Sequence, residues 1–100
     1  MQPQIIIQID NSAEHDREVI HRLVDTAMGK VDSYLKKYEN KPDATVRIEF
    51  FVKKNSDDSF HGKLRANIDG EIILFDRENF RKLDDLINHA FQHLKEQLAK

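Results

Sequence analysis

The sequence contains no cysteine and only three glycines in 100 residues. Without cysteine there is no disulfide scaffold, no thiolate metal site and no cysteine nucleophile. The glycines, Gly29, Gly62 and Gly70, are isolated from one another, so the chain has neither a phosphate-binding loop nor a dinucleotide fingerprint. Thiol chemistry is therefore excluded, and nucleotide-loop chemistry is disfavoured.

Long apolar runs and a large excess of one charge are also missing. No stretch approaches the roughly 20 apolar residues of a membrane helix, and the N-terminal Met1-Gln2-Pro3-Gln4 lacks the basic region of a secretory signal. We therefore expect no membrane association and a cytoplasmic location. The 16 basic and 18 acidic side chains give a net charge of −2. A nucleic-acid binder with this balance has to gather its cations on one face.

The chain does contain enough apolar material for one small core. Hydrophobic residues make up 39% of the sequence and charged residues 34%, which is typical of a compact fold with a highly charged surface. We find no internal repeat or linker, and we expect residues 1–100 to form a single domain.

The first half of the chain shows strand and helix periodicities in turn. The β-branched run Gln4–Ile9 predicts a strand, and Asp10-Asn11-Ser12 ends it. From about residue 13 to residue 38, apolar residues recur every three or four positions, which predicts a long amphipathic helix. Its N-cap is Asn11, Ser12 or Asp16, since all three residue types accept hydrogen bonds from a helix start.

The second half predicts three strands and a helix. Apolar and polar residues alternate over residues 46–53 and again over 63–68, and Asp69-Gly70 predicts a tight hairpin into residues 71–75. A second amphipathic helix is expected from about Asn79, with Phe80 in its apolar stripe. The predicted fold class is α+β, a two-layer sandwich of order β-α-β-β-β-α, with both helices on one face of a four-stranded sheet.

The sheet face turned away from the helices is one candidate binding surface. The alternation that buries the apolar strand positions projects basic side chains and one aromatic outward, namely Arg47, Phe51, Lys53, Lys63 and Arg65. If the last strand buries Ile72 and Leu74, then Ile73 and Phe75 join this outer face. Such a surface suits RNA, through cations and stacking, or a protein partner such as a second copy. An ordinary solvated sheet remains an equal alternative.

The second helix carries another candidate stripe at helical spacing, formed by Lys82, His89, His93 and Lys100. Its charge rises on acidification as the histidines protonate, so affinity for phosphate would rise too. His89 and His93 also have metal-ligand spacing, but the Glu of a zinc protease motif and a third ligand are missing. We therefore interpret both as solvated positions and expect no metal, no cofactor and no enzymatic activity.

The chain resembles the ribosome hibernation-promoting factor family, also called ribosomal subunit interface or sigma-54 modulation proteins. The resemblance spans nearly the whole sequence and is carried by diffuse hydrophobic patterns. The matching segments are Ile7-Gln8-Ile9, residues 27–35 (AMGKVDSYL), residues 46–54 (VRIEFFVKK), residues 62–72 (GKLRANIDGEI) and residues 80–87 (FRKLDDLI). The resemblance implies the same β-α-β-β-β-α fold.

The resemblance also implies a non-enzymatic protein that binds the small ribosomal subunit in the mRNA–tRNA channel and blocks translation under stress. Lys30, Lys53 or Lys54, and Lys95 match basic family positions, whereas His21, Ala27, His89 and Gln92 stand where the family tends to have Arg or Lys. The chain matches the short family type, which lacks the ribosome-dimerising C-terminal domain.

The candidate interface combines cations of the outer sheet face, of the second helix and of the matched family positions. The candidate RNA-binding residues are Lys30, Arg47, Lys53, Lys54, Lys63, Arg65, Lys82, His89, His93 and Lys95. Their expected partner is the rRNA of the small ribosomal subunit. The alternative is a diverged relative that uses the outer sheet face, with Phe51, Ile73 and Phe75, as a protein-binding or weak homodimer surface.

Overall fold

The structure, a computed structural model, describes residues 3–100. The prediction that the N-terminus is no secretory signal rests in part on Met1 and Gln2, which lie outside the described residues. The elements are β1 (Gln4–Ile9), the 3₁₀ segment η1 (Asn11–Asp16), α1 (Arg17–Leu35), the 3₁₀ segment η2 (Lys36–Tyr38), β2 (Val46–Lys54), β3 (Phe60–Ile68), β4 (Glu71–Phe80) and α2 (Leu83–Leu98). The predicted order β-α-β-β-β-α is confirmed.

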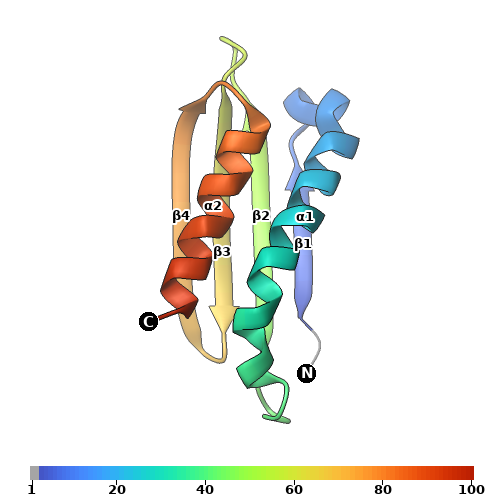
Figure 1. The fold of residues 1–100 in the computed structure, drawn as a ribbon. Helices are drawn as coiled ribbons and strands as arrows, with labels where there is room; N and C mark the ends of the chain where they lie inside the picture. The colour runs from blue at the N-terminus through green and yellow to red at the C-terminus, as the bar shows by residue number, and fades with distance from the viewer. Residues whose placement is uncertain (1–2) are drawn as a thin grey trace.

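The sheet has the strand order β1-β2-β3-β4, with β1 parallel to β2 and the remaining neighbours antiparallel. A parallel pair needs a crossover connection, and α1 supplies it. Both helices lie on the same face of the sheet (Figure 1). The predicted two-layer α+β sandwich is therefore confirmed. None of the helices within residues 3–100 is both long and apolar enough to cross a membrane.

The core lies between the sheet and the two helices. In β2 every second side chain is buried, and Phe50 is the largest side chain with almost no exposure. Its ring centroid lies 5.9 Å from that of Phe91 on α2, which joins the two layers. Each helix contributes one buried apolar stripe to the core: Ile20, Val24, Ala27, Met28, Val31 and Leu35 from α1, and Leu83, Leu86, Ile87, Ala90, Phe91, Leu94 and Leu98 from α2.

The first helical region starts earlier than the predicted boundary and has a different cap. Helical structure runs from Asn11 to Tyr38 as η1, α1 and η2. Asp10 caps it, because its Oδ2 accepts hydrogen bonds from the Ser12 backbone N (3.0 Å) and from Ser12 Oγ (2.6 Å). Asp16 precedes α1 but makes no side-chain capping bond. Asp16, one of the three predicted candidates, is therefore the N-cap residue of α1 without a side-chain bond, whereas the side-chain cap of the whole helical region is Asp10 and not Asn11 or Ser12.

The register of β4 reverses the predicted outer face. Asp69 and Gly70 have φ of 52° and 90°, which is the positive-φ pair of a two-residue hairpin turn. This turn sets Ile73 opposite Ala66 and Phe75 opposite Leu64, both on the helix-covered face. Ile73 is buried and Phe75 half-buried, whereas Ile72 and Leu74 are exposed. The prediction that Ile73 and Phe75 join the outer face was therefore wrong.

The end of β4 also differs from the predicted helix start. The strand continues to Phe80, which pairs with Phe60, and an irregularity in the ladder lies between Gly62 and Phe60 of β3. Asn79 has φ of 68°, which lets β4 hold one extra residue as a bulge. The second helix begins at Leu83, so the predicted start near Asn79 was wrong and Phe80 belongs to the sheet.

Candidate nucleic-acid interface

The ten candidate residues lie on separate surfaces of the molecule. Four of them, Arg47, Lys53, Lys63 and Arg65, are exposed on the outer sheet face, as the strand alternation predicted. Lys30 and Lys95 lie together on the helix layer. The remaining four lie elsewhere: Lys54 at the end of β2, Lys82 at the N-cap of α2, and His89 and His93 on α2 beside β4.

The outer sheet face mixes charges of both signs. Arg47 Nε lies 2.8 Å from Glu49 Oε1 on the same strand. Glu49 is also the direct neighbour of Arg65 across the β2–β3 ladder, and Asp76 is the direct neighbour of Lys63 across β3–β4. Phe51 lies half-buried in a shallow hollow of about 320 Å³ that Glu49, Lys63 and Arg65 help to line. Arg47, Lys63 and Arg65 therefore each have a carboxylate beside them, which reduces their attraction for phosphate.

One end of this face holds a histidine that sequence reasoning did not select. His61 Nε2 lies 2.6 Å from Asp76 Oδ1, and His61 Nδ1 lies 3.5 Å from Glu78 Oε1. Its side chain is 15% exposed. The β3–β4 register was the signal that could have revealed it, since it brings residues 61, 76 and 78 to one side of the sheet. This cluster adds Glu78 to the carboxylates of the outer face, beside Asp76.

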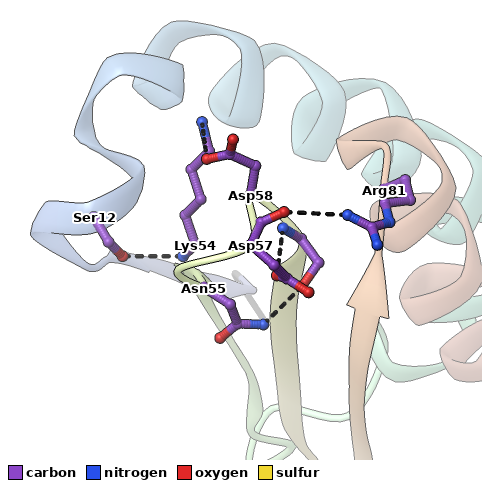
Figure 2. A network of polar contacts seen from close by, with 7 residues as sticks. Ser12, Lys54, Asn55, Asp57, Asp58 and Arg81 are labelled. Atoms are coloured by element: carbon purple, nitrogen blue, oxygen red, sulfur yellow. Dashed lines mark hydrogen bonds and ion pairs between the residues drawn. The ribbon is translucent and has the colours of Figure 1, made fainter.

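Lys54 lies away from the outer face, at the loop between β2 and β3. Its Nζ lies 4.0 Å from Asp58 Oδ1 and 5.6 Å from the centroid of the Phe60 ring. Its backbone N donates a hydrogen bond to Ser12 Oγ at 3.0 Å (Figure 2). Lys54 therefore joins η1 to the β2–β3 loop, and it shares no surface with Lys53.

The same loop is closed by a second set of contacts around Asp57. Asp57 Oδ1 accepts hydrogen bonds from Ser59 Oγ (2.6 Å) and from the Ser59 backbone N (3.0 Å). These bonds, led by the one from the Ser59 side chain, hold the pKa of the Asp57 carboxyl below its usual range. Arg81 Nη1 donates to the Asp57 backbone O at 3.1 Å (Figure 2). The network thus connects the loop to the segment that precedes α2.

The helix layer brings together two lysines that are far apart in the sequence. Lys30 of α1 and Lys95 of α2 line a hollow of about 70 Å³ between the helices. The other lining residues are Ala27, Val31, Asn88, Phe91 and Gln92, so the lining includes two side-chain amides and no carboxylate. Lys95 Nζ lies 5.8 Å from the centroid of the Tyr34 ring. Within residues 3–100, neither lysine is within 4.0 Å of a carboxylate oxygen.

The α2 histidines lie against aromatic rings of β4. The ring centroid of His89 is 5.3 Å from that of Phe80, and that of His93 is 6.1 Å from that of Phe75. These rings line an open groove of about 440 Å³ beside β4, together with Arg77, Gln92 and Glu96. His89 is exposed and His93 is half-buried, and both line this open groove. In the described part of the chain, no three His, Asp or Glu side chains are grouped to hold a metal ion.

Comparison with known proteins gives a match in structure. The fold is that of a two-layer α+β domain with one helix between β1 and β2 and one after β4. The crystal structure of the N-terminal domain of Thermus thermophilus Protein Y is similar, with a TM-score of 0.69 and 15% sequence identity over 98% of this chain and 96% of that chain. At this identity the match shows a shared fold. No protein-family model and no curated protein matches the sequence.

Proposed function

We propose that this chain is a ribosome-associated translation inhibitor that binds small-subunit rRNA in the mRNA–tRNA channel under stress. Two likenesses support the proposal. The sequence motifs resemble those of the ribosome hibernation-promoting factor family, and the whole fold matches that of the Protein Y domain. Neither likeness depends on a catalytic centre, and we propose a binding protein without enzymatic activity.

The hollow between α1 and α2 is the surface that we propose for the strongest rRNA contact. Lys30 and Lys95 lie on it without an ion-pair partner in the described chain, and Asn88 beside them can donate hydrogen bonds through its side-chain amide. The Gln92 amide instead donates to Glu96 at 3.3 Å. The two ammonium groups have no carboxylate oxygen within 4.0 Å in the described chain, whereas Arg47 of the outer sheet face is paired with Glu49, and Lys63 and Arg65 face carboxylates on neighbouring strands. Lys30 and Lys95 therefore suit phosphate oxygens better than these three cations do. This contrast is the observation that favours the helix layer.

The proposed mechanism is occupation of space. Lysine–phosphate contacts supply affinity and fix the orientation of the domain, but they read no base sequence. A two-layer sandwich with a well-packed core then fills the volume that mRNA and tRNA would need. Because phosphate contacts release counterions, binding should weaken as the salt concentration rises.

Co-sedimentation with small ribosomal subunits at low salt tests this function. We expect the wild-type chain to pellet with the subunits and the double variant Lys30→Glu/Lys95→Glu to remain in the supernatant. The matched control is Lys63→Glu/Arg65→Glu, which makes the same charge change on the outer face and should retain most of the binding. Removal of one lysine–phosphate interaction should reduce the slope of log affinity against log salt by about 0.7–0.9.

The possible outcomes separate the function from the interface. A wild-type chain that does not pellet with small subunits at low salt would refute the proposed function. If the wild-type chain pellets but only the outer-face variant loses binding, the function stands and the assignment to the helix layer is wrong.

A further inference from the structure

The outer edge of β4 has no strand partner within residues 3–100. β4 is the last strand of the sheet and pairs only with β3 (Figure 1). It is ten residues long. A long open edge presents unpaired backbone N–H and C=O groups that can pair with another strand. Its side chains determine which partner strand fits.

Apolar side chains flank this edge on both faces of the sheet. On the outer face, Leu74 is 64% exposed and Ile72 is 44% exposed, the highest values among the large hydrophobic residues described. On the helix-covered face, Phe75 and Phe80 border the open groove between β4 and α2. A strand added to this edge would remove apolar surface from water on both sides at once.

The charges along β4 are complementary to those of a second β4 in antiparallel orientation. Glu71 and Arg77 both point to the helix-covered face, since their β3 partners are the buried Ile68 and Gly62. In a two-fold pair centred on Leu74, each Glu71 lies opposite the Arg77 of the other copy. Opposite charges on directly facing residues stabilise a pair of strands. The two-fold axis forms this contact twice.

Neighbouring registers lose this complementarity. Centring the pair on Phe75 sets Ile73 opposite Arg77, and centring it on Ile73 sets Glu71 opposite Phe75. A shift that pairs odd with even positions would place helix-side residues opposite outer-face residues. The Leu74-centred register is therefore favoured, although it sets Ile72 opposite Asp76. We infer that two copies of this chain form a weak homodimer by antiparallel pairing of their β4 edges, centred on Leu74.

Because the chain has no cysteine, a single introduced thiol can test the register. In this dimer the two Leu74 Cα atoms face each other at about 4.5–5.5 Å, which is within the range of a disulfide. Under mild oxidation, Leu74→Cys should form a covalent dimer. The control Ile72→Cys is also exposed on the same strand, but its two thiols would be separated by four residues, about 13 Å. It should remain largely monomeric.

Charge reversal tests the complementarity without adding a covalent bond. Sedimentation velocity over a concentration series should show the wild-type chain shifting from monomer to dimer. Glu71→Arg and Arg77→Glu should each raise the dissociation constant about tenfold or more, because like charges then face each other twice. An equimolar mixture of these two variants should recover association, because every facing pair again has opposite charges. Arg22→Glu, on the exposed face of α1, should behave as the wild type.

A chain that stays monomeric up to its highest soluble concentration would overturn the inference. A dimer that is insensitive to Glu71→Arg, or one cross-linked by Ile72→Cys rather than Leu74→Cys, would refute the proposed pairing. None of these outcomes depends on ribosome binding.

Discussion

At the scale of single residues, the tightest glycine position in the molecule is Gly62. It lies on the buried face of β3, and a Cβ added there would lie 2.6 Å from Leu86 Cδ1 and 2.9 Å from Leu86 Cγ. Leu86 is fully buried, so little free space exists for its side chain to move away. The glycine therefore allows α2 to approach the sheet closely.

Substitution at two glycines should have opposite effects. Gly62→Ala should lower the free energy of unfolding by about 1–3 kcal/mol, since it overpacks a closed core. Gly29 lies on the exposed side of α1, and a Cβ added there would have no atom within 4 Å. Gly29→Ala should therefore raise the free energy of unfolding by about 0.5–1 kcal/mol. Equilibrium urea unfolding of both variants measures the difference. Equal stability of Gly62→Ala and the wild type would contradict this account of the contact.

At the scale of elements, the β2–β3 loop depends on an ionised Asp57. Hydrogen bonds from Ser59 lower the pKa of this carboxyl in the folded chain, whereas the unfolded chain has the ordinary value of 3.8. The stabilisation is therefore complete above pH 3.8 and is lost as the pH falls through the lower, folded pKa.

Unfolding measured from pH 7 to pH 2.5 should reveal this dependence. Asp57→Ala should be less stable than the wild type at pH 7, and its loss of stability on acidification should be smaller. Ser59→Ala keeps the backbone donor but removes the hydroxyl, so it should give an intermediate result. If the free energy of unfolding fell by the same amount on acidification in the wild type and in both variants, the Asp57 contacts would not contribute to the pH dependence of stability.

Elements with a long, regular pattern of apolar residues were predicted from the sequence. Features that depend on the pairing of strands were not. The alternation of β2 and the stripes of both helices identified the core correctly. The end of β4 was not predicted, since Asp76, Arg77 and Glu78 look like a loop until the positive φ of Asn79 and the pairing of Phe80 are known. The outer-face cations were placed correctly, but the carboxylates beside them follow from cross-strand register, which a single sequence does not specify.

At the scale of the whole molecule, the two proposed contacts use different surfaces. The hollow with Lys30 and Lys95 lies between the helices, whereas the dimer would form along β4. We therefore expect the two activities to be separable. Glu71→Arg should still pellet with small ribosomal subunits, and Lys30→Glu/Lys95→Glu should still dimerise in sedimentation velocity. Loss of both properties in either variant would show that the two surfaces are coupled.

The position of the two lysines has one further consequence. Lys30 and Lys95 belong to different helices and are neighbours only because α1 and α2 pack side by side on the sheet. A proteolytic fragment that retains just one helix would hold only half of the cationic pair. The proposed binding of a polyanion would therefore depend on the tertiary structure, and we expect short synthetic peptides copied from either helix to compete poorly with the folded chain for small ribosomal subunits.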